Sequence, residues 1–296
     1  MRPATHSGDP SDPRGLLMPA LTHEQERRHR QACQLVNLSR DLQQEEREFV
    51  LDYYRASTTG RSRSDRAHFT PRGLAIDMST EVIGNRVVDL AAGIGRLAYH
   101  NTNTWPCDSR ELVCVERNEE FVRVGRRVVP EARWICADIM TIPDMLDDLG
   151  TFDTAISNPP YGAIDRLIQA TLGYRGRRFE YHTIGLASMI ARHGVFLIPQ
   201  RSASFQFSGP AGKFVPGTGD DEYDKFVAAT GIELDHNCGI DTDHYRGSWH
   251  DVNVLVEVVT VDFADRAVPA PRAAAAPRPS AAAVAAAAEQ LSFLGF

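Results

Sequence analysis

The sequence predicts an α/β protein with a mostly parallel β-sheet and helices on both faces of the sheet. Two observations predict this class. From about His68 onwards, short apolar segments rich in β-branched residues alternate with segments of helical character, as in strands joined by crossover helices. In addition, residues 87–98 form an apolar strand that runs directly into a G-x-G-x-x-A turn and then into a helix.

The expected elements follow this alternation. Strands are expected at residues 86–90, 111–116, 133–137, 154–157, 194–199 and 252–261, with helices between them that include residues 119–128, 181–192 and 220–229. The run at residues 252–261 is the most strongly β-branched, and we expect it to close the far edge of the sheet. A glycine-rich stretch at residues 207–219 predicts a mobile loop that could cover a substrate.

Composition divides the chain into four parts. Residues 1–20 are rich in Pro, Gly, Ser and Asp, and residues 264–296 are dominated by Ala and Pro, so both are expected to be disordered. Residues 21–67 predict a helical arm and a linker. Residues 68–263 contain the alternating strands and helices and are expected to form the main domain.

The arm should be amphipathic and should pack on the main domain. Thr22 and Gln25 are spaced as in a capping box, which predicts that a helix begins there. Apolar residues recur at near-helical spacing as far as Tyr53, and residues 37–39 predict a bend or a break. Because the charges of the arm are mixed in sign, packing is favoured over direct recognition of a partner, which is the alternative.

Charge and composition restrict the location and the partners of the molecule. With 32 basic and 39 acidic residues the net charge is −7, so any contact with nucleic acid requires a local basic patch. The five cysteines have no paired short spacing, and no apolar run approaches the roughly 18 residues that a membrane span needs. We therefore expect no membrane contact, no metal site and a cytoplasmic location.

Polar residues are expected at the carboxyl ends of four neighbouring strands. Gly93 and Gly95 follow the first strand, where small residues allow a ligand to approach the backbone and the next helix presents free amides. Glu116 ends the second strand, where its carboxylate can accept both hydroxyls of a ribose. Asp138 ends the third strand and could accept an adenine amino hydrogen, and Asn158 ends the fourth. These positions predict one ligand crevice. Its first half, the glycine turn with the acid of the second strand, would also fit a dinucleotide.

The most informative stretch of the chain is Ser157-Asn158-Pro159-Pro160-Tyr161. Two consecutive prolines restrict the backbone, so the Asn158 side chain and the Pro159 carbonyl are expected in one fixed pose. This pose offers two hydrogen-bond acceptors beside the ring of Tyr161, which suits a planar amino group that donates both of its hydrogens. An ordinary Asn-Pro-Pro turn between a strand and a helix is the alternative.

A second motif, Phe69-Thr70-Pro71-Arg72-Gly73, is expected to open a helix beside the crevice. Thr70 could cap this helix, and the free amides at the helix N-terminus could bind a carboxylate. A helix cap without a ligand is the alternative.

In this order, the Phe-Thr-Pro element, the glycine turn, the two acids and Asn-Pro-Pro-Tyr resemble a class I S-adenosylmethionine-dependent methyltransferase of the amino-methylating type. The order is similar to the gamma arrangement of DNA adenine-N6 methyltransferases, and the specific motifs cover residues 68–200. The resemblance implies a Rossmann-like fold with a seven-stranded sheet and S-adenosylmethionine as the cofactor. The cofactor-binding residues that it implies are Phe69, Thr70, Pro71, Asp89, Ala91, Gly93, Gly95, Glu116, Asp138 and Ile139.

The activity that the resemblance implies is methyl transfer to an exocyclic amino nitrogen, first of all adenine N6 in DNA. Asn158, Pro159, Pro160 and Tyr161 would form the catalytic clamp, and Tyr161 would stack on a base flipped out of the duplex. Many such DNA enzymes carry a large target-recognition domain, but here only about 60 residues lie between Pro199 and the tail. Methylation of an RNA base or of a protein glutamine, and a non-catalytic module that binds the cofactor or nucleic acid, are the alternatives.

Two further stretches are candidates for the substrate side. Residues 173–179 mix arginines with aromatic residues and could hold phosphates and stack on bases, with a solvated loop as the alternative. The second candidate is the cluster of His244, Tyr245, Trp249 and His250, for which core or rim packing is favoured.

The C-terminal peptide Gln290–Phe296 resembles the short peptides by which bacterial replication and repair proteins dock on the sliding clamp. Its position at the end of a flexible tether suits such a role, although the aromatic residue and the leucine are transposed from the usual order. An apolar tail that folds back on the domain is the alternative.

Overall fold

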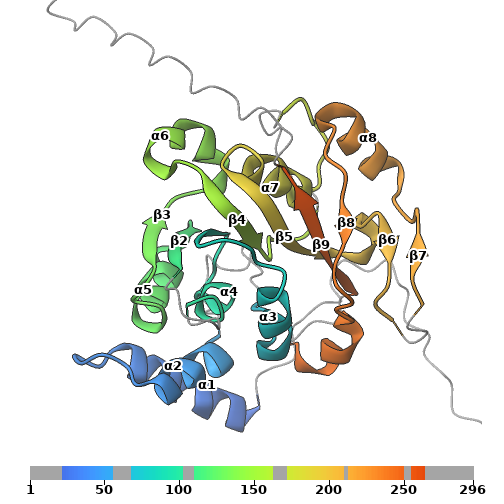
Figure 1. Ribbon diagram of the computed structural model, residues 1–296. Coiled ribbons are helices and arrows are strands. Elements are labelled where there is room, and N and C mark those ends of the chain that lie inside the picture. The colour runs from blue at the N-terminus through green and yellow to red at the C-terminus, as the bar shows by residue number, and fades with distance from the viewer. Residues whose placement is uncertain are drawn as a thin grey trace, which may run out of the picture.

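The computed structural model describes residues 22–55, 68–102, 110–162, 172–209, 213–249 and 255–263 (Figure 1). The segments expected to be disordered, residues 1–20 and 264–296, lie outside the described residues, and so does the peptide Gln290–Phe296. In the described ranges, no helix is both long enough and apolar enough to cross a membrane.

A seven-stranded sheet forms the centre of the molecule (Figure 1). In spatial order its strands are β3 (Arg133–Cys136), β2 (Glu111–Glu116), β1 (Arg86–Leu90), β4 (Phe152–Ser157), β5 (Ala191–Pro199), β9 (Val256–Asp262) and β8 (Asp235–His236). The first five strands pair in parallel, whereas β9 pairs antiparallel with both of its neighbours. The predicted fold class, a mostly parallel seven-stranded sheet, is confirmed.

The strand order places a topological switch point between β1 and β4. The chain moves outward from β1 to β2 and β3, and then returns to β4 on the other side of β1. The connections that follow β1 and β4 therefore leave the sheet in opposite directions, and a crevice opens at the carboxyl ends of these two strands. Val87, Val88 and Asp89 of β1 pair with Thr154, Ala155 and Ile156 of β4.

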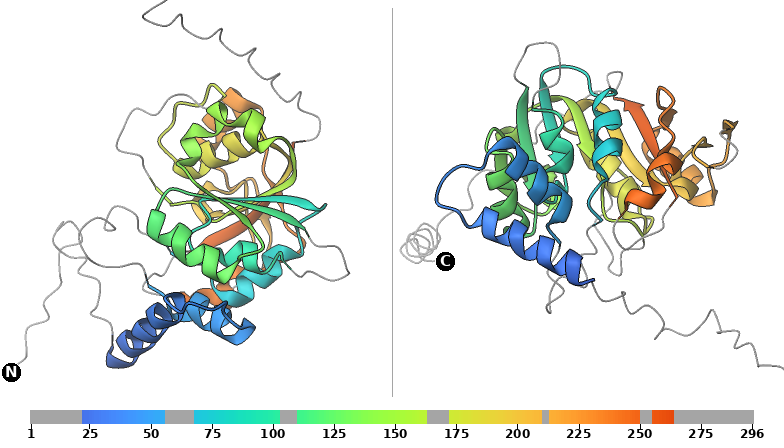
Figure 2. Two further views of the ribbon diagram at one scale, coloured as in Figure 1. Left: turned by 90° about the vertical axis from the view of Figure 1, so that its left-hand side faces the viewer. Right: turned by 90° about the horizontal axis from the view of Figure 1, so that it is seen from below.

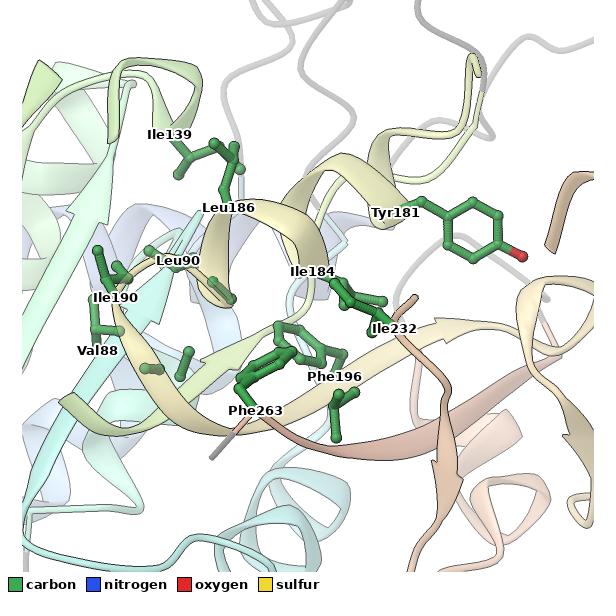
Figure 3. Packing of buried hydrophobic residues seen from close by; sticks show 14 of the residues in the cluster. Val88, Leu90, Ile139, Tyr181, Ile184, Leu186, Ile190, Phe196, Ile232 and Phe263 are labelled. Atoms are coloured by element: carbon green, nitrogen blue, oxygen red, sulfur yellow. The ribbon is translucent and has the colours of Figure 1, made fainter. Parts of the chain in front are cut away.

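Helices cover both faces of the sheet because successive strand residues point to opposite sides (Figure 2). Val88 and Leu90 of β1 are buried in the core beneath α6 (Leu146–Leu149), α7 (Phe179–Ala187) and α8 (Asp221–Thr230). Figure 3 shows the close packing of this core, with Ile184 and Leu186 of α7 beside Phe196 and Leu90 of the strands. Each such fully buried aliphatic side chain contributes about 1.5–3 kcal/mol through removal from water.

The opposite face of the sheet carries three further helices. They are α3 (Arg72–Ser79), α4 (Arg96–Tyr99) and α5 (Glu119–Val128). Val87 of β1 points to this face and packs with Leu74 of α3 and Leu97 of α4. The position of α3 and α4 is therefore fixed by the same strand that leads into the glycine turn.

The N-terminal arm consists of α1 (His23–Val36) and α2 (Gln44–Tyr53), and lies against the side that carries α4 and α5 (Figures 1 and 2). The capping box at Thr22 and Gln25 is confirmed, and the expected break separates the two helices. The Tyr54 hydroxyl donates to Glu120 Oε1 of α5 at 2.5 Å. The prediction that the arm packs on the rest of the chain is confirmed.

Two expectations about element positions are wrong. The strand expected at residues 252–261 does not close the sheet, because β8 pairs along the outer side of β9. The sequence did not reveal β8, since a strand of two residues is too short to produce a periodic pattern. The helix expected at residues 181–192 ends at Ala187, and β5 begins at Ala191. Ala191 pairs with Phe152 of β4, so the sheet ladder determines where the strand begins.

The segment expected to be a mobile loop contains a short strand. β7 (Val215–Pro216) pairs antiparallel with β6 (Phe205–Gln206) in a separate two-stranded sheet. The carboxylate of Glu257 on β9, fully buried, accepts hydrogen bonds from the backbone N–H groups of Phe207 and Ser208 at 3.0 and 2.9 Å. These bonds attach the start of the segment to the main sheet.

Candidate active site

A pocket of about 280 Å³ lies at the carboxyl ends of β1, β2, β3 and β4. The pocket is lined by the predicted residues Phe69, Thr70, Asp89, Ala91, Gly93, Glu116, Asp138, Ile139, Asn158, Pro159, Pro160 and Tyr161. The strand-end residues of the sequence and the Asn-Pro-Pro-Tyr stretch therefore share one cavity.

Two predicted residues, Pro71 and Gly95, do not line the pocket. Pro71 is the residue that precedes α3, and Gly95 is the residue that precedes α4. Gly95 has a φ of +89°, and a Cβ atom there would lie 3.0 Å from the side chains of Trp134 and Val129. Glycine at this position therefore allows a left-handed turn and close packing, rather than the approach of a ligand.

The side chain of Asn158 is held from two sides. Its Nδ2 atom donates to the His68 carbonyl at 2.9 Å and to Thr70 Oγ1 at 3.0 Å. Its Oδ1 atom accepts a hydrogen bond of 2.5 Å from the Tyr161 hydroxyl. An amide oxygen has two lone pairs, so Oδ1 can accept one more hydrogen bond, for example from an amino group in the pocket.

Thr70 does not cap the neighbouring helix, contrary to the prediction. The N-cap of α3 is Pro71, and no side chain caps this helix. Thr70 is almost fully buried, and its hydroxyl accepts from the Asn158 amide instead. A buried amide N–H that lacked this acceptor would cost free energy, which explains why the hydroxyl faces Asn158 and not the helix.

The ring of Tyr161 is half-buried and packs against the apolar cluster that contains Leu74 and Leu97. Burial, and to a smaller extent the charge of Glu180, raise the pKa of the Tyr161 phenol well above its ordinary value. A phenol is protonated at neutral pH even at its ordinary pKa of about 10, and the raised pKa extends this to higher pH, so the hydroxyl can donate to Asn158. Pro159 is buried and Pro160 is exposed beside it.

Glu116 and Asp138 accept hydrogen bonds from backbone amides at the edge of the pocket. The carboxylate oxygens of Glu116 accept from the Gly93 and Asn118 N–H groups at 2.9 and 2.8 Å. Burial raises the pKa of Glu116, and these backbone donors oppose the shift. Asp138 Oδ1 accepts from the Met140 N–H at 2.9 Å, at the start of the 3-10 helix Ile139–Asp144.

Asp89 is the most deeply buried acid in the pocket. Its Oδ2 atom accepts from the Ala98 N–H at 3.1 Å, while Oδ1 is buried and has no hydrogen-bond partner among the described residues. Burial, and less strongly the charge of Glu116, raise the pKa of Asp89 well above its ordinary value. The next pocket residue, Ala91, has a φ of +57°, a left-handed conformation that residues with a Cβ atom rarely adopt.

Several lining residues were not predicted from the sequence. They are His68, Ala92, Arg96, Leu97, Arg117, Phe121, Ala137 and Gly162. Phe121 contacts Phe69 edge-to-face with 5.5 Å between ring centroids, so two aromatic rings meet at the pocket wall. The sequence did contain a signal for Arg96, because it is the sole basic residue in the apolar stretch 87–98.

Of the predicted substrate-side residues 173–179, Phe179 lines the pocket, Arg175 and Arg177 are exposed, and two others make contacts within the fold. Tyr174 is buried against Tyr181 and Phe226, so it cannot stack on a base, and the prediction for it is wrong. Arg178 pairs with Asp220, with 2.9 Å between Nη1 and Oδ1.

The cluster before β9 also serves packing. The Tyr245 hydroxyl donates to Asp77 of α3, and Trp249 is buried in the core of the same face. Tyr245, Trp249 and His244 do not line the pocket. His250 lies outside the described residues. The packing alternative is therefore favoured for this cluster.

No protein-family model and no curated protein matches the sequence. Solved structures do match. A modification subunit of a putative type I restriction enzyme from Vibrio vulnificus has 12% identity and a TM-score of 0.48, and the match covers 76% of this chain and 51% of the subunit.

Two other matches concern RNA and the cofactor. A putative RNA methyltransferase from Pyrococcus horikoshii has 15% identity and a TM-score of 0.42, over 74% of this chain and 97% of that protein. A fibrillarin from Aeropyrum pernix, solved with natively bound S-adenosyl-L-methionine, has 13% identity and a TM-score of 0.39. This match covers 64% of this chain and 74% of the fibrillarin.

This chain spans about half the length of the Vibrio subunit and of TrmN from Thermus thermophilus. Several of the matching structures are named as methyltransferases or as a methylase. At these identities and TM-scores, the similarity decides neither the activity nor the substrate.

Proposed function

We propose that the protein is an S-adenosylmethionine-dependent N-methyltransferase and that its substrate is adenine N6 in DNA. The observation that carries the proposal is the shared pocket, in which the acids at the ends of β1, β2 and β3 lie with the Asn-Pro-Pro-Tyr clamp at the end of β4. A cofactor site without the clamp would fit many enzymes. The clamp adds acceptors suited to a planar amino group, and a hydride-transfer enzyme has no evident use for them.

The described residues fit S-adenosylmethionine as the cofactor. Glu116 and Asp138 both line the pocket, where Glu116 would accept ribose hydroxyls and Asp138 an adenine amino hydrogen, as the resemblance implies. The rings of Phe69 and Phe121 and the carboxylates of the pocket suit a cationic sulfonium. The unpaired Oδ1 atom of Asp89 is a buried acceptor that an ammonium group could satisfy.

Asn158 and Pro159 would act on the acceptor nitrogen. An aromatic amine is a weak nucleophile because its lone pair is delocalised into the ring. Asn158 Oδ1 and the Pro159 carbonyl would each accept one N–H, which favours a tetrahedral nitrogen with a free lone pair. The bound sulfonium supplies an electrophilic methyl group, so positioning and electrostatics can provide most of the rate acceleration.

The protein residues would accept hydrogen bonds throughout, and not the proton itself. When bound, the cofactor would supply the methyl group and would keep the electron pair of the S–C bond that it loses, and the nitrogen would release one proton to water. His68 and Thr70 would hold the Asn158 amide with its oxygen towards the amine during this step. A base would have to leave a duplex to reach the pocket, and the ring of Tyr161 would provide a surface on which it stacks.

DNA is preferred as the substrate because the Phe69-Thr70-Pro71 element borders the same pocket as the clamp, in the order of the gamma arrangement. Methylation of RNA or of a protein glutamine is the second candidate, and the net charge of −7 favours it. The matching structures include proteins named for DNA modification and for RNA methylation, so they do not separate these candidates.

The experiment that tests the proposal uses S-adenosylmethionine with a labelled methyl group. The protein is incubated with duplex DNA, RNA and a protein extract, and labelled nucleosides are identified by mass spectrometry after digestion. We expect N6-methyladenine in DNA. Label in RNA or protein alone, or in N4-methylcytosine, would reject the adenine-N6 DNA assignment, and label nowhere would favour a binding module.

A further inference from the structure

A second pocket lies beside the small sheet that consists of β6 and β7, at the edge of the main sheet formed by β8 (Figure 1). It has a volume of about 320 Å³ and is lined by Phe205, Phe207, Phe214, His236, Asn237, Cys238 and Gly239. None of these residues lines the pocket that holds the clamp. The volume lies within the range of small-molecule sites, about 300–1,000 Å³.

The walls of the second pocket include aromatic rings that solvent can reach. The ring of Phe214 stacks on that of Phe205, with 5.8 Å between the centroids and 26° between the planes. It also meets the ring of His236, with 5.5 Å between the centroids. Phe214 is 44% exposed and His236 is exposed as well. The pocket therefore offers flat apolar surfaces on which a flat ligand can stack.

One of these walls is fixed by the main sheet. The buried carboxylate of Glu257 on β9 accepts from the backbone N–H of Phe207, next to β6. Phe205 is almost fully buried, so folding itself holds its ring in place. A surface that is ordered before a ligand binds reduces the entropy cost of binding.

The segment that carries the three phenylalanines contains no acidic residue. Residues 201–219 have two charged side chains, Arg201 and Lys213, and both are basic and exposed. This is unusual in a chain with 39 acidic residues and a net charge of −7. Lys213 directly precedes Phe214, so a positive charge stands beside the exposed ring.

The acids around the second pocket belong to other elements. Asp220, the first acid after the segment, pairs with Arg178, with 2.9 Å between Oδ1 and Nη1. Glu233 and Asp235 are exposed and belong to the approach to β8 and to β8 itself. A polyanion is therefore favoured along the small sheet and opposed along β8.

The small sheet begins at the edge of the main sheet where the first pocket opens. Because β4 and β5 are parallel, Gly162 after β4 and Ser202 after β5 follow strand ends at the same edge. The first two residues of α7 join them. The N–H of Phe179, which lines the first pocket, donates to the Gly162 carbonyl at 3.3 Å, and Glu180 accepts from Ser202 Oγ at 2.7 Å.

We propose that the second pocket binds an unpaired base of the nucleic-acid strand whose target base enters the first pocket. The base stacks on the ring of Phe214, and Lys213 contacts a phosphate of the same strand. This inference rests on the proposed function, because it takes nucleic acid as the substrate. It adds that the strand is unpaired beyond the target base, since a base inside a duplex is stacked on its neighbours.

Packing within the fold is the alternative role for these rings. Phe205 has this role in any case, because it is buried. A single exposed apolar residue needs no further explanation. Phe214, however, shares an open pocket with two more phenylalanines and a histidine, and its neighbour in the chain is basic. This combination of rings and positive charge is typical of surfaces that bind single strands.

The test measures the affinity of the full chain for a labelled single-stranded DNA of roughly 12 nucleotides by fluorescence anisotropy. Phe214→Ala should weaken binding roughly 5- to 150-fold, the loss expected for one stacked base. Phe214→Tyr keeps the ring and should bind within about 3-fold of wild type. Phe214→Leu keeps an apolar side chain without a flat ring, so it should resemble the Ala variant.

The same oligonucleotide annealed to its complement is the matched ligand. Phe214→Ala should weaken the binding of this duplex by less than about 3-fold, because its bases stay stacked in the duplex. Lys213→Ala should reduce the slope of log affinity against log salt concentration for the single strand by about 0.7, the value for one phosphate contact. Ile83→Ala is the control variant, because Ile83 is exposed and apolar but lines neither pocket. Its affinity should equal that of wild type.

Three results would overturn the inference. They are an unchanged affinity for the single strand in Phe214→Ala, an equal loss for the single strand and the duplex, and wild-type affinity in Phe214→Leu. Adenosine monophosphate that binds as tightly as the oligonucleotide would also contradict it, because the pocket would then recognise a free nucleotide and not a strand.

The affinity for S-adenosylhomocysteine, measured on the same proteins, separates the inference from the proposed function. If this ligand binds but the affinity for the strand does not depend on Phe214, the inference fails and the cofactor assignment stands. If the strand binds through Phe214 but S-adenosylhomocysteine does not bind, the cofactor assignment fails and the second pocket remains a site for an unpaired base.

Discussion

The Asn158 amide nitrogen donates to the Thr70 hydroxyl at 3.0 Å, although the two residues are 88 positions apart in the chain. The bond joins the end of β4 to Thr70, which lies two residues before the start of α3. Together with the bond to the His68 carbonyl, it uses both N–H groups of the amide. The amide orientation is therefore set, so that the oxygen is the atom available to an amino group in the pocket.

Replacement of Thr70 should reduce turnover by loosening Asn158. Thr70→Val keeps the shape but removes the acceptor, while the His68 carbonyl still holds one N–H. One lost neutral hydrogen bond corresponds to about 0.5–1.5 kcal/mol, so we expect kcat to fall roughly 3- to 10-fold. Thr70→Ser should behave like wild type. Equal kcat values for the Val and Ser variants would contradict the orienting role.

Tyr161 should contribute through its ring more than through its hydroxyl. Tyr161→Phe removes the donor to Asn158 Oδ1 and keeps the stacking surface, so we expect KM for the nucleic acid to stay within about 3-fold of wild type. Tyr161→Ala removes about 1–3 kcal/mol of stacking, which should raise KM roughly 5- to 150-fold. Similar KM values for the two variants would show that no base stacks there.

The buried carboxyl of Asp89 should make stability depend on pH. Because its pKa is raised in the native state, the native protein holds a proton that the unfolded chain has released above about pH 4. The free energy of unfolding should therefore fall as pH rises through the interval between the ordinary and the raised pKa. The slope from this group is at most about 1.4 kcal/mol per pH unit.

Asp89→Asn isolates this effect. The variant has no ionisable group there, and its amide oxygen can still accept from the Ala98 N–H. The free energy of unfolding is measured with urea, without ligand, at pH 5 and at pH 8. The difference between the variant and the wild type, in favour of the variant, should be larger at pH 8. An equal difference at both pH values would mean that Asp89 does not titrate in this range.

Ala91 should be under backbone strain that glycine relieves. A left-handed conformation costs a residue with a Cβ atom about 1–2 kcal/mol, whereas glycine pays about 0.5–1 kcal/mol more chain entropy on folding. Ala91→Gly should therefore raise the free energy of unfolding by up to about 1.5 kcal/mol. The neighbouring Ala92, whose φ is not positive, is the control. Ala92→Gly should lower the free energy of unfolding. A loss of stability in both variants would contradict the strain.

The sequence predicted the sheet and most of the pocket for a simple physical reason. Parallel strands bring their carboxyl ends together, so Glu116, Asp138 and Asn158, each at the end of its own strand, had to meet at one edge. The prolines after Asn158 marked the clamp because they restrict the backbone locally. Such local signals can be read without knowing the tertiary contacts.

The residues that were missed or were given the wrong role depend on tertiary contacts. Arg96 is held by Asp52, 44 positions earlier, and no local pattern links an arm helix to the glycine turn. Thr70 has the spacing of a helix cap, but a buried amide from β4 takes its hydroxyl. Tyr174 stands among arginines in the sequence, yet its ring is buried in the core. In each case a distant partner overrides the local preference.

The most direct test of the account is the Asn158→Ala variant, measured both for methyl transfer to DNA and for the affinity of S-adenosylhomocysteine. The loss of a preorganised acceptor of this kind costs roughly 10²- to 10³-fold in rate. The account predicts a loss of at least that size, with the affinity within about 3-fold of wild type. Turnover close to wild type in Asn158→Ala would contradict the central claim, that the Asn158 oxygen activates the acceptor nitrogen.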